Sequence, residues 1–221
     1  MLGTRVRSPI RAARMTASVF GTLAGLGGLT HGIGETRQGN VAAGGVLINS
    51  WTEGPIAAYM GGEPGMTFIP NLLVTGALTI FVSLTIIVFA CAFVKRKNGG
   101  LVLLLLSIIL LLVGGGFAPP IIGIISGVAA LAINAPLTWW RKHLSASVRR
   151  VFALVWPWVF GVCLINGVFL VVGSVILVYF FGLNNPDLFV ESFLFGVLIL
   201  LVTVVTGIAY DIENGGRSTV L

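Results

Sequence analysis

The 221-residue chain is 57% hydrophobic and only 9% charged, with a mean hydropathy of +1.05. Water-soluble domains carry about 25% charged residues, so this composition excludes an ordinary soluble enzyme and makes a bilayer the expected solvent. A net charge of +6 would suggest a nucleic acid partner in a soluble protein, but here the basic residues form short clusters beside apolar runs. We therefore expect contact with anionic membrane lipids and no nucleic acid partner.

Apolar segments recur along the chain, and a membrane-crossing helix uses about 20 residues. They predict an all-α integral membrane protein, a bundle of about six transmembrane helices in a single polytopic domain over residues 1–221. The expected spans are residues 15–34, 70–94, 101–113, 121–137, 152–181 and 188–210.

The first span, 15–34, follows a basic N-terminal segment. No small-x-small cleavage site comes directly after it, so a retained helix is expected rather than a cleaved signal peptide. Small residues recur in this span at spacings of three and four, which places them on one helix face. They are Gly21, Gly25, Gly28 and Gly32. Such a face predicts close packing against another helix.

Two ionisable residues, His31 and Glu35, lie on or beside the glycine face where the first span ends. Residues 35–66 are expected to form an external loop with short interfacial or re-entrant pieces. A packing face that ends at the membrane surface would account for both residues. The alternative is an external ligand or proton site built from His31, Glu35, Glu53 and Glu63.

The next three spans are closely connected. The second, 70–94, ends at the basic residues 95–97, and the third begins directly after them. Glycines at 114–116 and prolines at 119 and 120 separate the third span from the fourth, which predicts a tight helical hairpin. In the fourth span, Gly123 and Gly127 repeat the packing pattern of the first.

The fifth span, 152–181, is longer than a bilayer requires and contains Pro157. This predicts a kink at the proline or an interfacial first turn. Asn166 places a strongly polar side chain deep in the same span, where an amide usually bonds across to another helix. The sixth span, 188–210, follows a turn rich in asparagine and proline.

Charge falls unevenly on the two sides of this six-span arrangement. With the N-terminus in the cytoplasm, every basic residue except Arg37 lies inside. The acidic residues expected outside are Glu35, Glu53, Glu63, Asp187 and Glu191. The positive-inside rule therefore predicts a multi-pass protein of the cell (plasma) membrane with both termini in the cytoplasm.

Hydroxyl side chains follow one face of the second span, at Thr75, Thr79 and Ser83. A polar path for a solute would use them together with Asn166. Serine and threonine in helices also commonly bond their own helix backbone, so the same stripe is compatible with a purely structural role.

Catalytic and cofactor motifs are missing from the sequence. Cys91 and Cys163 form no CxxC pair, and His31 and His143 are expected on opposite sides of the membrane. Nucleotide-binding loops and hydrolase motifs do not occur. We therefore expect no metal, no cofactor and no catalysis.

Two functions remain as hypotheses. Glycine faces and few buried polar groups favour a non-catalytic accessory subunit, scaffold or homo-oligomer. Its partners would be membrane lipids and other membrane protein subunits or further copies of itself. The alternative is a channel or facilitator for a small uncharged solute, which would use the hydroxyl stripe and the external loop.

Overall fold

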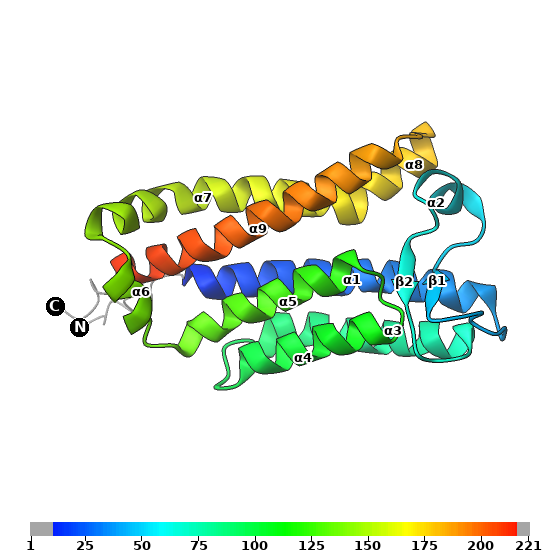
Figure 1. Ribbon diagram of the computed structural model, residues 1–221, viewed down its shortest axis with the longest axis horizontal. Helices are drawn as coiled ribbons and strands as arrows, with labels where there is room; N and C mark the ends of the chain where they lie inside the picture. The colour runs from blue at the N-terminus through cyan, green and yellow to red at the C-terminus, as the bar shows by residue number, and fades with distance from the viewer. Residues whose placement is uncertain (1–10, 216–221) are drawn as a thin grey trace, which may run out of the picture.

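The computed structural model describes residues 11–215 (Figure 1). The basic residues Arg5, Arg7 and Arg217 and both chain termini lie outside the described residues. The α-helices and strands are, in chain order, α1 (Ala12–Gln38), β1 (Leu47–Asn49), α2 (Gly54–Tyr59), β2 (Pro64–Met66), α3 (Leu72–Val88), α4 (Gly99–Leu112), α5 (Ala118–Leu131), α6 (Thr138–His143), α7 (Ala146–Val168), α8 (Ser174–Phe181) and α9 (Pro186–Gly215).

Three short segments extend or join these helices. The π-helical segment η1 (Phe89–Phe93) continues α3, and the 3₁₀ turn η2 (Ala132–Asn134) continues α5. A second π-helical segment, η3 (Phe169–Gly173), joins α7 to α8. The six expected spans thus coincide in position with α1, α3–η1, α4, α5–η2, α7–α8 and α9.

The structure consists mainly of α-helices, which confirms the all-α part of the prediction. Three helices are long and apolar enough to cross a membrane: Leu72–Phe93, Ala146–Phe181 and Pro186–Gly215. Two shorter apolar helices, Gly99–Leu112 and Ala118–Asn134, accompany them. The number of crossings and the sides on which the termini lie stay predictions.

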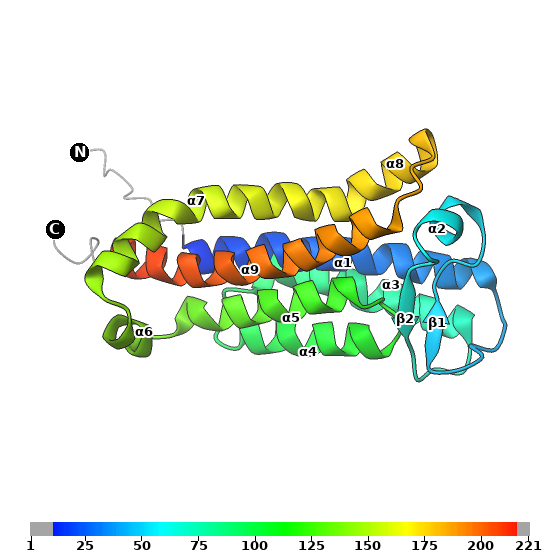
Figure 2. The ribbon, with the colours of Figure 1, turned by 45° about the horizontal axis from the view of Figure 1, so that its top comes forward.

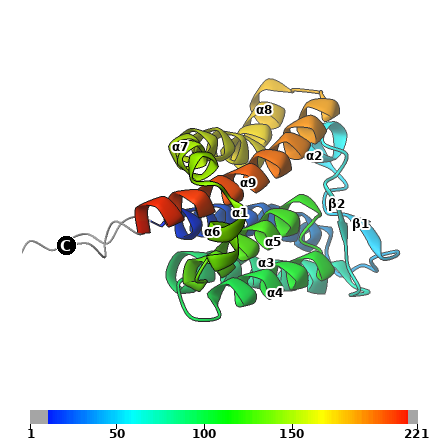
Figure 3. The same cartoon turned by 60° about the vertical axis from the view of Figure 1, so that its left-hand side comes forward.

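The helices form three layers, which the oblique view in Figure 3 separates most clearly. One layer contains α7, α8 and α9, the middle one contains α1 and α5, and the third contains α3 and α4. α1 therefore lies between the other two layers, and 15 of its 27 residues are buried. A helix enclosed by other helices does not need a lipid-facing apolar surface, which explains how α1 tolerates its glycines and polar residues.

Glycines make the close contacts of this central helix possible. A Cβ added at Gly25 would lie 2.8 Å from the backbone oxygen of Ser83, and one at Gly32 would lie 2.9 Å from that of Gly76. The other glycines of the two expected packing faces also meet helices of this chain. Gly21 meets Ala90, Gly28 meets Ser83, Gly123 meets Ser107 and Gly127 meets Leu104.

α7 and α9 run side by side as a long antiparallel pair, and α8 diverges from the line of α7 (Figure 2). The helix at the fifth span begins six residues before the expected start at residue 152. It starts at Ala146, with Ser145 as its N-cap. The Ser145 hydroxyl accepts from the Val148 N–H, which satisfies one free donor of the first turn. Pro157 lies inside this helix, whose α-helical assignment continues to Val168.

The two ends of the described chain meet at one end of the bundle. The backbone N–H groups of Ala12 and Ala13 donate to the two carboxylate oxygens of Asp211 on α9, at 2.6 and 3.0 Å. These N–H groups belong to the first turn of α1 and have no acceptor within their own helix. An acidic side chain from the last helix therefore caps the first one.

A small cap closes the opposite end of the bundle. Strands β1 and β2 pair antiparallel, with Ile48 opposite Gly65, and α2 lies between them in sequence. The expected external loop of residues 35–66 starts four residues later in the structure, because α1 continues to Gln38. The cap covers the end of α1 that carries His31 and Glu35.

Candidate functional site

A chain of buried polar side chains connects α1 to the cap. His31 and Glu35 are four residues apart on α1 and therefore share a face. Ser50, which follows β1, lies between them. Its hydroxyl is 2.8 Å from His31 Nδ1 and donates to Glu35 Oε1 at 3.1 Å. Glu35 and Ser50 are fully buried, so these hydrogen bonds replace the water that the groups would otherwise bind.

Two glycines in the turn between α4 and α5 allow this arrangement. A Cβ at Gly116 would collide with the His31 ring, and one at Gly114 would lie 2.7 Å from both carboxylate oxygens of Glu35. Both glycines have positive φ angles, +114° at Gly114 and +73° at Gly116, which side chains rarely adopt. The turn thus packs its bare backbone directly against the two ionisable groups.

Glu63 extends the polar chain to its outer end. Its Oε2 lies 3.7 Å from His31 Nε2, and this buried oxygen accepts no hydrogen bond within the described part of the chain. The Glu63 backbone has a φ of +51° and follows Gly61 and Gly62, whose φ angles are also positive. A left-handed conformation costs a residue other than glycine about 1–2 kcal/mol, and such strain concentrates at functional sites.

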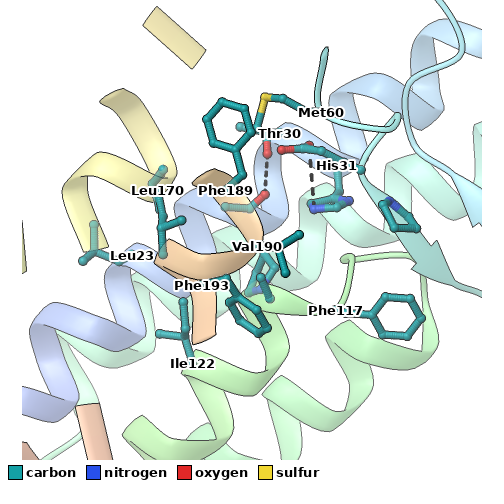
Figure 4. Close-up of a pocket in the computed structure, with 16 residues that line it drawn as sticks. Leu23, Thr30, His31, Met60, Phe117, Ile122, Leu170, Phe189, Val190 and Phe193 are labelled. Carbon is teal, nitrogen blue, oxygen red and sulfur yellow. Dashed lines mark hydrogen bonds and ion pairs between the residues drawn. The ribbon is translucent and has the colours of Figure 1, made fainter. Parts of the chain in front are cut away.

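A pocket of about 250 Å³ opens beside His31 and Glu63 (Figure 4). Its walls come from α1, the cap, the first turns of α5 and α9, and the segment around η3. Most of the lining side chains are apolar, among them Leu23, Phe117, Ile122, Leu170, Phe189 and Phe193. The pocket therefore offers an apolar body with polar groups concentrated where α1 meets the cap.

The pocket is elongated along α1. His31 and Leu23 both line it and are eight residues apart, which corresponds to about 12 Å along a helix. Thr30 also lines it, but its hydroxyl donates to the Gly27 carbonyl oxygen at 2.6 Å. His31 and Glu63 are the ionisable side chains among the described residues that line the pocket.

Burial and hydrogen bonding set the protonation of Glu35 and the tautomer of His31. Burial raises the pKa of Glu35, just beyond the expected first span, to about 8, and the hydrogen bond from the Ser50 hydroxyl opposes part of that rise. With Ser50 donating to Glu35, His31 donates through Nδ1 and turns Nε2 toward Glu63.

Ser50, His31 and Glu63 are the residue types of a hydrolase triad, but the serine is not accessible to a substrate. Ser50 is fully buried and does not line the pocket, so its hydroxyl cannot reach a substrate there. A nucleophile must contact the reacting carbon. The geometry therefore supports binding rather than acyl transfer.

The structure brings together three of the four residues named for an external site. Ser50 joins His31 to Glu35, and Glu63 lies beside His31, whereas Glu53 is exposed at the start of α2. Ser50 and the phenylalanines of the pocket were missed by sequence reasoning, because none of them belongs to a periodic pattern or motif. The three glycines at 114–116 were the one feature of the sequence that could have indicated this packing. Glycine lets the backbone approach other side chains closely.

The residues named for a polar path do not converge. Thr75, Thr79 and Ser83 lie on α3, and the Thr79 hydroxyl donates to the Val113 carbonyl oxygen at 2.7 Å. Asn166 lies on α7 and donates to the Ser192 carbonyl oxygen of α9 at 3.1 Å. Neither of the two described pockets contains both Asn166 and the α3 hydroxyls.

Between residues 11 and 215, no group of three or more His, Cys, Asp or Glu side chains is placed to hold a metal ion. Comparison with protein-family models, curated proteins and solved structures found no match.

Proposed function

We propose that this chain is a non-catalytic, multi-pass membrane protein that binds an amphipathic molecule in the pocket between α1, α5 and α9. The observation that carries the proposal is an apolar pocket with its polar groups, His31 and Glu63, at one end. Burial of an apolar body supplies about 25 cal/mol for each Å² removed from water. The polar end fixes the orientation of the ligand, as a few convergent polar groups do in most ligand sites.

The distribution of charge supports a position for this pocket in the membrane. The connection that contains Arg96, helix α6 with Arg141, and the start of α7 with Arg149 lie at the end where Asp211 caps α1. Glu53 and Glu63 lie at the cap end. By the positive-inside rule, the cap faces outward and the polar end of the pocket lies at the level of the outer headgroups.

Photolabelling in lipid nanodiscs tests this proposal. The probe is a ten-carbon primary alcohol with a diazirine in its chain, and labelled residues are mapped by peptide mass spectrometry. We expect saturable labelling of pocket residues on α1, α5 and α9. In Val190→Trp, a bulky ring on the pocket wall should reduce that labelling at least tenfold, because Val190 lines the pocket and is 57% exposed.

The matched control is Leu194→Trp, one turn further along α9. Leu194 is 61% exposed but does not line the pocket, so pocket labelling should be unchanged. Labelling that does not saturate and spreads evenly over α7 and α9 would contradict the proposal. Equal labelling in Val190→Trp and the parent protein would contradict it too.

The outer layer supports a second candidate, an accessory subunit or homo-oligomer. Trp158, Phe180 and Phe181 on α7 and α8 are each at least 75% exposed. Such a surface suits either lipid or another protein chain. Native mass spectrometry after mild detergent purification distinguishes these, because a stoichiometric second protein or a defined oligomer supports the candidate. A monomer that carries lipid alone counts against it.

A further inference from the structure

We infer that the ligand has a hydrogen-bond-donating head group without negative charge, a hydroxyl or an amine, and that Glu63 recognises it. This inference rests on the proposed function and specifies the chemical class of the ligand. Three features of the pocket support it. The Glu63 carboxylate lacks a hydrogen-bond donor, no cationic side chain is among the described residues of the pocket wall, and the apolar part has a defined length.

The Glu63 carboxylate has an acceptor to spare. Its Oε2 is buried and accepts no hydrogen bond from any described residue, while His31 Nε2 stands 3.7 Å away. Buried carboxylate oxygens in folded proteins nearly always meet donors, because an unpaired one loses its hydration without compensation. That oxygen is shielded from the pocket, but Glu63 lines the pocket with a side chain that is 18% exposed. Its other oxygen, Oε1, accepts no hydrogen bond from the described residues either, so a donor on the ligand would bind there.

An anionic head group would find no counter-charge. Of the polar side chains along the pocket wall, Thr30 has already committed its hydroxyl proton to the Gly27 carbonyl oxygen. No Lys or Arg is among the described residues that line the pocket. The nearby cation Arg37 instead stacks over the Trp51 ring, with its guanidinium carbon 5.8 Å from the ring centroid. A phosphate or carboxylate would therefore meet the negative charge of Glu63.

The apolar part of the pocket sets the size of the ligand body. From His31 to Leu23 it extends about 12 Å along α1, which suits a chain of roughly ten carbons. Phe117, Phe189 and Phe193 border this volume. A head group bound at Glu63 would thus place the body of the molecule against aromatic side chains and away from water.

The test is competition among three molecules that differ only in their heads. The photoreactive ten-carbon alcohol labels the protein in nanodiscs of zwitterionic lipid at pH 7.5. Unlabelled ten-carbon alcohol, amine and carboxylate compete at equal concentrations in the membrane. We expect the alcohol and the amine to compete at least tenfold better than the carboxylate.

Variants of Glu63 identify the residue responsible. In Glu63→Gln, competition by the amine should weaken about tenfold, and the advantage of the amine over the carboxylate should shrink accordingly. Glu63→Asp keeps the charge and tolerates the left-handed backbone, so it should retain the preference even if Glu63→Gln fails to fold. The control is Glu53→Gln, which removes an exposed carboxylate of the same cap and should change nothing.

The outcomes separate this inference from the proposed function. If the carboxylate competes as well as the amine, or if Glu63→Gln leaves their ratio unchanged, the head-group inference is wrong although the pocket still binds. If no probe labels the pocket saturably, the proposed function fails, and the inference fails with it.

Discussion

Glu35 brings a carboxyl group into the protein interior without a basic partner beside it in the described chain. Its pKa is raised from 4.5 to about 8, so between these pH values the folded protein binds a proton that the unfolded chain releases. The free energy of unfolding must then fall as pH rises through this window and level off above pH 8. At 1.36 kcal/mol for each pKa unit, the change is on the order of 5 kcal/mol.

Glu35→Gln should remove this pH dependence. We expect the melting temperature of the parent protein in detergent to fall between pH 5 and pH 9 more steeply than that of the variant. The difference between the two curves isolates Glu35 from other titrating groups. Parallel curves would show that Glu35 has an ordinary pKa.

Ser50 holds two buried groups at once, so its loss should cost more than one hydrogen bond. Ser50→Ala leaves His31 Nδ1 and Glu35 Oε1 without their partner. At about 1–3 kcal/mol for each of these two unsatisfied buried groups, we expect a loss of about 2–6 kcal/mol, measured as a lower melting temperature. Thr52→Ala, two residues along in the same segment and exposed, should have little effect. If both variants melted at the same temperature, the hydrogen bonds of Ser50 would not contribute to the stability of the fold.

At the scale of elements, the contact between α1 and α3 depends on glycine. A Cβ at Gly32 would lie 2.9 Å from the Gly76 oxygen and 3.0 Å from the Ile80 nitrogen, which are backbone atoms and cannot rotate away. We expect Gly32→Ala to cost about 1–3 kcal/mol by forcing the helices apart. Gly161→Ala on α7 should instead stabilise the folded protein by up to about 1 kcal/mol. A Cβ added there meets no neighbouring atom within 4 Å, and alanine favours the helix over glycine. Thermal melting of both variants should therefore show shifts of opposite sign.

The same element illustrates what a sequence pattern can and cannot indicate. Glycines spaced by three and four predict that another helix approaches closely, and α3 does so. The pattern does not say whether the neighbour belongs to the same chain. Because the faces that contain Gly25 and Gly127 are occupied within this chain, they no longer favour an additional subunit.

Helix positions were predictable, whereas the cap was not. Apolar runs of membrane length are a strong local signal, and each expected span coincides with a helix or a helix pair. The pairing of β1 with β2 and the position of Ser50 depend on contacts with residues far away in sequence. The helical spacing of His31 and Glu35 drew attention to the end of α1, and an external site with Glu53 and Glu63 was only an alternative to a packing face. The apolar pocket beside His31 and Glu63 requires the assembled helices.

At the scale of the whole molecule, the orientation in the membrane is open to a direct test. In a variant with Cys91 and Cys163 replaced by alanine, single cysteines are introduced at Thr52 in the cap and at Lys97 at the opposite end. We expect a membrane-impermeant maleimide to label Thr52→Cys on intact cells and Lys97→Cys only after permeabilisation, because basic segments stay in the cytoplasm. The reverse pattern would place the cap inside the cell.

The cap that Asp211 provides to α1 also orders events during synthesis. Ala12 and the carboxylate that accepts its N–H are 199 residues apart in sequence, so α1 is synthesised long before the helix that caps it. This contact can form only after α9 has been made and has docked against α1. Until then the N–H groups at the start of α1 depend on water.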